Sequence, residues 1–337
     1  MGYSPGAGPA PTLCSGPSLP PPAGTRQPGS LMLMPQPRLK PLLKPKALPK
    51  PGSRPDMKTA FITGSASGIG AGLVSKLLEQ GWRVFAGHRS TDPSGAPWYG
   101  HHNVIPVQCD VTHPEQIELA QQVIRQDRPQ GLDLLINNAA YSGNSGVVEA
   151  ADLNDYRYTF ESNFWGPLQM CRAMMPLLRQ ARGRIINITS ASIYLTIPMG
   201  SSYPVSKTAL DALTRHLRME LAPFGVEVTA LAPGGVATPM TAFGAELSEQ
   251  QWQAIPEPLR SQYRQYFLDG ASAVSDNFKL YSPEAFAERV YRKVICARTL
   301  KPAYLIGPGV AALPWLHRLL PVQQVQNIWL RMFSVKN

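Results

Sequence analysis

Short apolar runs alternate regularly with helix-like segments over most of this chain of 337 residues. The runs are rich in β-branched or aromatic residues and occupy 59–63, 83–87, 104–108, 132–136, 184–188, 226–231 and 303–307. The segments between them that space their apolar residues as a helix does are 69–80, 114–126, 152–180 and 203–222. Near-continuous apolar strands separated by helices are typical of βαβ units, whose parallel sheet is covered on both faces. The sequence therefore predicts a single doubly wound, Rossmann-like α/β domain of about seven strands over 57–337, with an insertion at 239–283.

The first 56 residues differ in composition from the rest of the chain. They contain 15 of the 34 prolines, seven basic residues and one acidic residue, and so carry +6 of the net charge of +10. Such a segment cannot bury a core, and we expect 1–56 to be a disordered extension. Basic charge without interleaved aromatic residues binds nucleic acid weakly, so no nucleic-acid partner is expected. Prolines disfavour the amphipathic helix of an organellar address, which leaves a solvated extension, or an upstream start with Met57 as the working one.

Four widely spaced cysteines, Cys14, Cys109, Cys171 and Cys296, contain no Cys-x-x-Cys pair. This spacing argues against a disulfide framework or a zinc knuckle and favours a reducing compartment, the cytoplasm. No metal site is expected. No uninterrupted apolar run reaches the ~18 residues that a membrane-spanning helix needs.

A glycine-rich turn, TGSASGIG at 63–70, joins the first predicted strand to the first helix. Such a turn lets the backbone approach a pyrophosphate, which the helix N-terminus then stabilises. Two further segments, CDVT at 109–112 and NNAA at 137–140, follow the third and fourth strands, where ligands of open parallel sheets lie. The sequence therefore predicts a dinucleotide site that includes Gly64, Ser65, Ser67, Gly68, Ile69, Gly70, Asp110, Val111, Asn138 and Ala139.

Five motifs together resemble the short-chain dehydrogenase/reductase family over roughly Met57 to Thr238. They are Thr63-Gly64-x-x-x-Gly68-Ile69-Gly70, Asn137-Asn138-Ala139, Ser190, Tyr203-x-x-x-Lys207 and Pro233-Gly234. The resemblance implies an oxidoreductase that transfers a hydride between a nicotinamide cofactor and an alcohol or carbonyl. It implies catalytic roles for Ser190, Tyr203, Lys207 and Asn163, the last holding a water beneath the lysine. It adds Tyr203, Lys207, Pro233, Gly234, Val236 and Thr238 to the cofactor site.

Tyr203 and Lys207 are four residues apart, which on a helix places them on one face. A free phenol has a pKa near 10, and a nearby cation favours the phenolate, so the pair is suited to proton transfer at the substrate oxygen. Ser190 could hydrogen-bond the same oxygen, and its position 13 residues before Tyr203 favours it over Ser192. Pro204 predicts extended backbone at Tyr203 and a helix that starts here.

The cofactor is predicted to be NADP, with NAD as the alternative. No Asp or Glu lies between Arg83 and Thr91, where an acidic residue would bind the adenosine ribose of NAD. Arg89, which follows His88 at the end of the second predicted strand, is placed to bind the 2′-phosphate of NADP. The resemblance also implies a homodimer that pairs through 152–180 and 203–222.

The insertion at 239–283 is predicted to be a substrate lid because it carries widely spaced aromatic and apolar residues. These are Met240, Phe243, Trp252, Tyr263, Tyr266, Phe267 and Phe278. The apolar C-terminal segment 309–333 could cover the pocket, rest on a membrane interface or complete the core. Both segments favour a bulky apolar substrate, steroid- or retinoid-like, although Arg260 and Arg264 leave a carboxylate clamp open. Two other functions remain alternatives: a non-catalytic dinucleotide-binding regulator, and an adaptor whose Pro-rich extension binds partner modules.

Overall fold

The computed structural model describes residues 57–143, 146–196, 200–242, 252–263 and 280–333. The predicted extension 1–56 lies outside the described residues, as do Phe243, Arg264, Tyr266, Phe267 and Phe278 from the predicted lid. The boundary between extension and domain stays a prediction.

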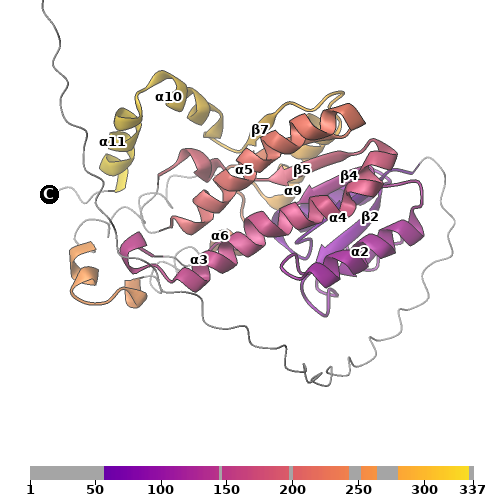
Figure 1. Ribbon diagram of the computed structural model, residues 1–337, viewed down its shortest axis with the longest axis horizontal. Coiled ribbons are helices and arrows are strands. Elements are labelled where there is room, and N and C mark those ends of the chain that lie inside the picture. Colours follow the sequence, from indigo (N-terminus) through magenta and orange to yellow (C-terminus); the bar gives the residue numbers. More distant parts are fainter. Residues whose placement is uncertain (1–56, 144–145, 197–199, 243–251, 264–279, 334–337) are drawn as a thin grey trace, which may run out of the picture. The chain divides into compact units, whose positions relative to one another are not determined.

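Seven parallel strands form one sheet in the order β3-β2-β1-β4-β5-β6-β7 (Figure 1). Their bounds are β1 Thr59–Ile62, β2 Arg83–His88, β3 Val104–Gln108, β4 Leu134–Asn137, β5 Arg184–Ile188, β6 Glu227–Pro233 and β7 Ala303–Ile306. The four residues of β1 are all buried, as are those of β4. All seven predicted strands are therefore confirmed, and the order reverses direction between β1 and β4, which is the ligand-binding switch point of doubly wound sheets.

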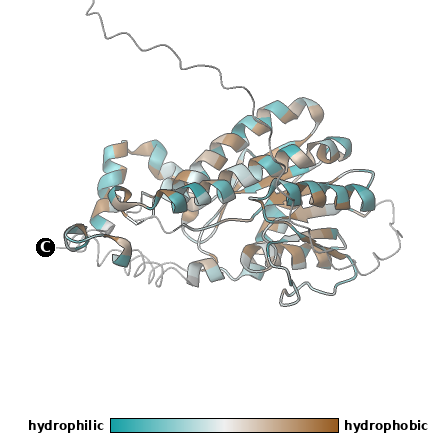
Figure 2. Ribbon diagram, turned by 60° about the horizontal axis from the view of Figure 1, so that its bottom comes forward, coloured by the Kyte–Doolittle hydropathy of each residue, from teal (hydrophilic) through white to brown (hydrophobic). Residues whose placement is uncertain are grey.

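Helices cover both faces of the sheet. One layer contains α1 (Gly68–Glu79) and α9 (Pro283–Val290), and the other contains α2 (Pro114–Asp127), α4 (Gly166–Ala181) and α5 (Ser202–Leu221). The strand pleat divides the core accordingly: Ile62 of β1 packs with the first layer, and its neighbour Phe61 packs with the second. The helices present teal and brown residues together, as helices with one buried face do (Figure 2). The predicted doubly wound fold is confirmed.

The predicted helix 152–180 is divided into three consecutive elements. They are α3 (Leu153–Phe160), a π-helical turn η2 (Glu161–Trp165) and α4. A second π-turn, η5 (Tyr291–Ile295), continues α9. Such π-turns are rare and occur frequently at functional sites, and η2 contains Asn163.

Further elements are short or lie toward the C-terminus. They are η1 (Val148–Ala150), η3 (Ala191–Tyr194), η4 (Ala222–Phe224), α6 (Pro239–Ala242), η6 (Val310–Ala312), α10 (Leu313–Leu319) and α11 (Val322–Phe333). Val325 and Trp329 of α11 pack with residues of α10 and with Leu195, which follows η3. We call α10 and α11 together the C-terminal hairpin. Within the described residues, no helix has the length and apolar character needed to cross a membrane.

Candidate active site

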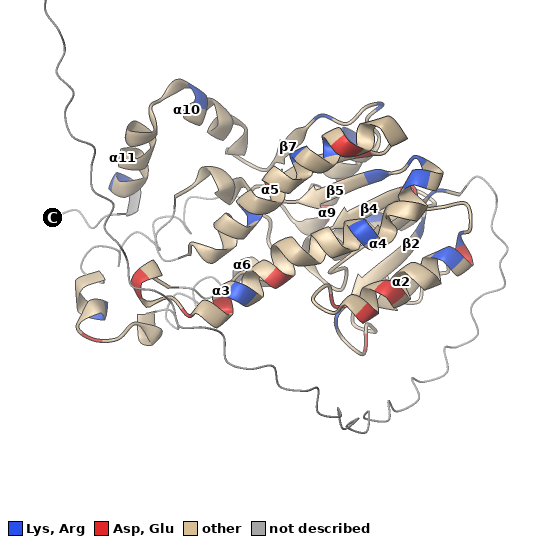
Figure 3. Ribbon diagram, in the orientation of Figure 1, with Lys and Arg blue, Asp and Glu red and all other residues tan. Residues whose placement is uncertain are grey.

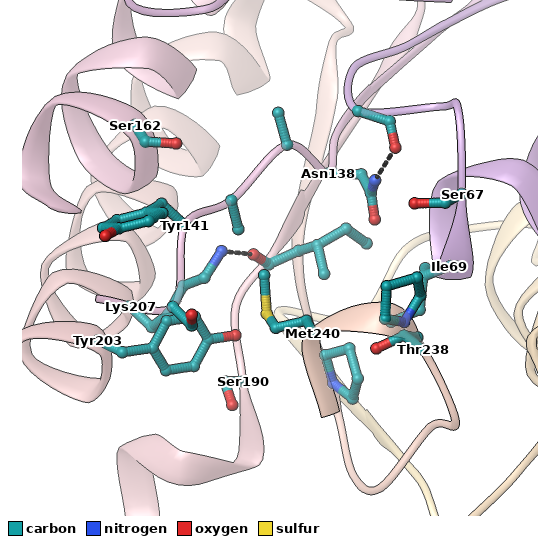
Figure 4. Close-up of a pocket in the computed structure, with 18 of the residues that line it drawn as sticks. Ser67, Ile69, Asn138, Tyr141, Ser162, Ser190, Tyr203, Lys207, Thr238 and Met240 are labelled. Carbon is teal, nitrogen blue, oxygen red and sulfur yellow. Dashed lines mark hydrogen bonds between the residues drawn. The ribbon is translucent and has the colours of Figure 1, made fainter. Parts of the chain in front are cut away.

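A cavity of about 880 Å³ opens at the carboxyl ends of the strands (Figure 4). Of the predicted cofactor-binding residues, fifteen line this cavity: Gly64, Ser67, Gly68, Ile69, Arg89, Asp110, Val111, Asn138, Ala139, Tyr203, Lys207, Pro233, Gly234, Val236 and Thr238. The predicted catalytic Ser190 lines it as well. The predicted residues Ser65, Gly70 and Asn163 do not line it.

The glycine turn is compact because neighbouring backbone leaves no room for side chains. Gly64 has a φ of +62°, and a Cβ placed on it would lie 2.7 Å from the Cα of Ala139. A Cβ on Gly70 would lie 2.2 Å from the carbonyl oxygen of Gly64. Gly70 therefore shapes the turn from behind, without touching the cavity itself.

Polar contacts hold the turn against the end of β4. The side-chain amide of Asn138 donates to the carbonyl oxygens of Thr63 and Gly64, both at 3.0 Å. The hydroxyl of Thr63 accepts from the backbone N–H groups of Asn138 and Ala139, also at 3.0 Å. This cradle is open on the cavity side, and its shape fits the phosphate-bearing part of a dinucleotide.

The Ser65 side chain contacts β2 and does not line the cavity. It is fully buried, and its hydroxyl donates to the carbonyl oxygen of Gly87 at 2.8 Å. The Ser65 side chain is thus engaged by a buried acceptor on the neighbouring strand, and the predicted cofactor contact of this residue stays a prediction.

The end of the cavity near β2 contains His88 and Arg89. His88 is 4% exposed, its Nδ1 lies 2.7 Å from the carbonyl oxygen of Ser90, and burial lowers the pKa of its imidazole. Since the carbonyl can only accept, Nδ1 carries the proton. Arg89 is exposed and donates to the Tyr158 hydroxyl at 3.5 Å, so its guanidinium makes one long neutral contact among the described residues. Asp110, at the end of β3, accepts from the backbone N–H of Thr112 at 3.0 Å.

Lys207 is buried at the cavity wall, one turn after Tyr203 on α5. It is 1% exposed, and its Nζ donates to the carbonyl oxygen of Ile188 at 2.8 Å. Burial lowers the pKa of Lys207 to about 7. No ion pair to Lys207 occurs within the described residues, so the amine is held by a neutral carbonyl.

Burial raises the pKa of the Tyr203 phenol. The hydrogen bond with the Ser190 side chain acts in the opposite direction but is the smaller effect. The sequence argument that Lys207 favours the phenolate therefore does not hold in the ligand-free site. Desolvation penalises the charged forms of both groups, so a neutral phenol faces the cavity. Figure 4 shows Tyr203 and Lys207 pointing into the cavity from the same helix, with Ser190 beside the phenol.

The backbone at Tyr203 is helical, which corrects the extended geometry predicted from Pro204. The helix α5 begins at Ser202, so Pro204 lies in its first turn. The N–H that proline lacks has no intrahelical partner at this position, and the ring is therefore tolerated. The predicted helix start at this proline is confirmed.

Asn163 acts behind the cavity wall. Its side-chain oxygen accepts from the backbone N–H of Tyr141 at 2.8 Å, and its amide donates to the Tyr141 carbonyl at 2.8 Å and to Ser206 at 3.0 Å. The hydroxyl of Ser206 in turn donates to the carbonyl oxygen of Tyr203 at 2.7 Å. Asn163 thus ties the loop after β4 to α5, and the predicted water-holding role remains a prediction.

Several cavity residues carry no sequence motif and were not predicted. They include Ala66, His88, Ser90, Tyr141, Ser142, Tyr158, Ser162 and Leu195. The hydroxyl of Tyr141 donates to Asp155 at 2.8 Å, and burial raises its pKa to about 12. The available signal was position: His88 is the last residue of β2, and Tyr141 follows the end of β4 at Asn137 by four residues. Ligands of open parallel sheets lie beyond such strand ends.

The fold and the site together define a short chain dehydrogenase. The sequence model of the family described as "short chain dehydrogenase" matches residues 58–249, more than half of the chain, and the chain belongs to this family. Similar proteins include retinol dehydrogenase 5 of Mus musculus, 34% identical over 203 residues that cover 58% of this chain and 63% of the relative. The mitochondrial D-beta-hydroxybutyrate dehydrogenase of Mus musculus is 32% identical over 221 residues, which cover 62% of this chain and 64% of the relative.

A third relative is matched over more of its length. The NADPH-dependent 1-acyldihydroxyacetone phosphate reductase of Schizosaccharomyces pombe is 31% identical over 228 residues, 67% of this chain and 74% of the relative. Among solved structures, a short chain dehydrogenase from Burkholderia cenocepacia in complex with NADP has a TM-score of 0.62 and 26% identity. That match covers 83% of this chain and 98% of the solved chain. The chain thus spans less than two thirds of the length of the dehydrogenases described above, and somewhat more of the reductase.

Proposed function

We propose that the protein is an NADP-dependent oxidoreductase that interconverts a bulky, neutral, apolar alcohol and its carbonyl compound, with a steroid- or retinoid-like substrate. One observation carries this proposal: Tyr203, hydrogen-bonded to Ser190 and one turn from buried Lys207, shares a cavity with the glycine turn. A family member that has lost catalysis would have no need to keep these three side chains together, and this argues against a non-catalytic regulator.

The state of the tyrosine supports the carbonyl-reducing direction. Burial raises the pKa of Tyr203, so at neutral pH its phenol holds the proton that a reduced substrate oxygen must receive. The hydroxyl of Ser190 donates to the same oxygen and stabilises the charge that develops there. The nicotinamide, when bound, supplies the hydride. Lys207, with a pKa of about 7, is a nearby proton source that returns the phenolate to the phenol.

The preference for NADP rests on Arg89. Its guanidinium is exposed at the cavity end formed by β2, and its one described contact is a neutral hydroxyl. A phosphate dianion would be a far stronger partner for a guanidinium than a phenol. Among the described residues that line the cavity, Asp110 is the acidic one, and its carboxylate accepts hydrogen bonds from Thr112. NAD remains the alternative.

The choice of a neutral substrate rests on the distribution of charge. Besides Lys207, the ionised residues that line the cavity are Arg89 and Asp110, and both lie at the ends of β2 and β3, away from the catalytic helix. Other lining residues, among them Ser142, Ser192, Leu195, Gly200 and Met240, are uncharged. Apart from Lys207, whose amine is buried and donates to the carbonyl oxygen of Ile188, a substrate carboxylate would therefore have no cation near that helix among the described lining residues.

Arg260, which the sequence left open as a carboxylate clamp, is engaged elsewhere. Its guanidinium donates to the carbonyl oxygen of Ile255 at 3.0 Å and lies 3.6 Å from Glu257. Of the predicted lid, Trp252 and Ile255 are buried against Val147, and Met240 lines the cavity. These contacts support an apolar cover over the site.

The test is the catalytic efficiency of carbonyl reduction, followed at the nicotinamide absorbance with NADPH and with NADH. We expect efficiency to rise with the apolar size of neutral ketones and to be lowest for a short keto acid. Efficiency that stays flat, or falls, as apolar size increases would contradict the substrate class. Turnover after deletion of 1–56 would show whether the extension serves catalysis or, as in the adaptor alternative, a separate function.

Two surfaces support assembly with larger partners. Apolar side chains on and beside α5 are exposed, among them Val205 at 47%, Met219 at 75% and Phe224 at 43%, and we propose that this surface forms a homodimer. The C-terminal hairpin exposes Trp315 at 60% and Leu319 at 72%, with Arg318 and Arg331 but no acidic residue on α10 or α11 (Figure 3). This composition supports peripheral contact with an anionic membrane surface, which co-sedimentation with anionic and zwitterionic vesicles would test.

The compartment is proposed to be the cytoplasm. All three described cysteines, Cys109, Cys171 and Cys296, are free thiols, which supports a reducing environment.

A further inference from the structure

The connection between β2 and β3 buries a tryptophan against the glycine turn. Trp98 is 2% exposed, and its indole Nε1 donates to the carbonyl oxygen of Ser65 at 2.7 Å, across 33 residues of sequence. The residue does not itself line the cavity. Any buried indole N–H needs an acceptor. Here the acceptor is the Ser65 carbonyl oxygen, so the hydrogen bond also fixes one peptide group of the turn.

Ser65 is held from two sides. Its backbone N–H and its hydroxyl both donate to the carbonyl oxygen of Gly87 at 2.8 Å, and its own carbonyl oxygen accepts from Trp98. Both hydrogen-bond donors of Ser65 are therefore occupied, and the peptide group that follows it cannot reorient without breaking the bond to Trp98. The orientation of that peptide is set by β2 on one side and by Trp98 on the other.

The same peptide group carries the N–H of Ala66. Because the peptide bond is planar and trans, this N–H points opposite to the Ser65 carbonyl and thus away from Trp98. Ala66 lines the cavity, and no hydrogen bond from its N–H is found within the described part of the chain. Backbone N–H groups of a turn before a helix are donors that anions bind.

We propose that Trp98 is a positioning residue of the cofactor site: it fixes the Ser65–Ala66 peptide so that the Ala66 N–H is presented to a phosphate oxygen of the dinucleotide. The ring of Trp98 also lies 6.4 Å from that of His88, a cavity residue at the end of β2. One buried side chain thus supports both the glycine turn and the neighbouring strand end. The inference rests on the proposed use of a nicotinamide cofactor.

The first test is the affinity of purified full-length Trp98→Phe protein for NADPH, measured by calorimetry and by cofactor fluorescence. Phenylalanine retains most of the packing and removes the N–H. We expect the dissociation constant to rise about tenfold, the size of one lost hydrogen bond to a charged group. The kcat at saturating NADPH should be unchanged, because Tyr203, Lys207 and Ser190 are not displaced. Trp315→Phe, at an exposed position, is the matched control and should bind as the parent does.

The second test needs no variant, so the inference can be overturned even if Trp98→Phe folds poorly. In ¹⁵N-resolved spectra of the parent protein, the amide proton of Ala66 should move downfield when NADP is added. An Ala66 amide that does not respond, or a folded Trp98→Phe protein that binds NADPH as tightly as the parent, would overturn the inference alone. A parent protein that binds none of NADP, NADPH, NAD or NADH would instead overturn the proposed function.

Discussion

The Nζ of Lys207 lies 5.7 Å from the centre of the Tyr203 ring, while its hydrogen bond goes to the carbonyl oxygen of Ile188. The lysine is therefore next to the phenol without being bonded to it. Both groups are desolvated, which lowers the pKa of the lysine and raises that of the tyrosine. The pair is therefore suited to donating a proton. Burial of the amine without a counter-charge reduces the stability of the folded protein.

Replacement of Tyr203 by phenylalanine should abolish turnover and leave cofactor binding nearly intact. The variant removes the proposed proton donor, and it keeps the ring that lines the cavity. We expect kcat to fall by at least about 10²-fold, the lower end of what general acid–base catalysis contributes. The NADPH dissociation constant should change less than about twofold, within what a single lost contact gives. Retention of most of the activity by Tyr203→Phe would refute the assignment.

Replacement of Lys207 by methionine should raise stability at low pH while removing activity. The folded-state pKa of about 7 is far below the ordinary value of 10.5, so the unfolded chain binds a proton that the folded chain lacks between these values. Parent stability therefore rises with pH from about 7 to 10.5, and the cost of the buried charge is complete below pH 7. The Lys207→Met variant avoids this cost, worth a few kcal/mol.

Urea unfolding of the cofactor-free proteins at pH 6, 8 and 9.5 measures this difference. The advantage of Lys207→Met over the parent should be largest at pH 6 and should shrink as the pH rises. Lys293→Met, at an exposed position on η5, serves as the control and should show no such trend. A variant less stable than the parent at pH 6 would mean that the amine is not buried as described.

The sheet could be predicted from sequence because its strands are buried on both faces, so that runs such as 184–188, with Ile185, Ile186 and Ile188, are mostly apolar. The proximity of Tyr203 and Lys207 could be predicted because they are close in sequence, at a spacing that a helix converts into contact. The glycine turn could be predicted for a similar reason, since the close approach of Gly70 to Gly64 lies within one short segment of sequence.

Contacts between segments distant in sequence could not be predicted in this way. Nothing near Trp98 indicates that its indole reaches Ser65, and nothing near Asn163 indicates that its amide holds the backbone of Tyr141. The effect of burial on the Tyr203–Lys207 pair was also missed, because desolvation depends on what covers a side chain. The sequence shows the charge of a residue but not its surroundings.

Gly70→Ala should weaken cofactor binding although Gly70 does not line the cavity. Its Cβ would lie 2.2 Å from the Gly64 carbonyl oxygen and 2.6 Å from the side-chain nitrogen of Asn138. The turn must shift, and we expect a loss of about 1–3 kcal/mol in the free energy of unfolding together with weaker NADPH binding. Gly95→Ala is the matched control, since no heavy atom lies within 4 Å of a Cβ there. Equal behaviour of the two variants would show that the turn is not constrained as described.

The proposed homodimer should be visible as a doubled mass in light scattering at micromolar concentration. Met219 of α5 is 75% exposed, and a charge placed in a dimer interface would be buried without a partner. Met219→Glu should therefore shift the mass toward that of a monomer, whereas Leu119→Glu, at a half-exposed position on α2, should not. A parent protein that is strictly monomeric at this concentration would contradict the proposal.

Arg89 should decide between the two nicotinamide cofactors. Its guanidinium is exposed at the end of β2 that lines the cavity, and its described partner, the Tyr158 hydroxyl at 3.5 Å, competes weakly with a phosphate. Arg89→Ala should raise the Michaelis constant for NADPH about tenfold, because a charge-assisted hydrogen bond to phosphate is lost. The constant for NADH should stay within about twofold, since that cofactor has no 2′-phosphate. Arg125→Ala, an exposed position on α2 outside the cavity, controls for the loss of surface charge. Equal effects of Arg89→Ala on the two cofactors would show that Arg89 does not bind the phosphate, and the preference for NADP would then have no support from this residue.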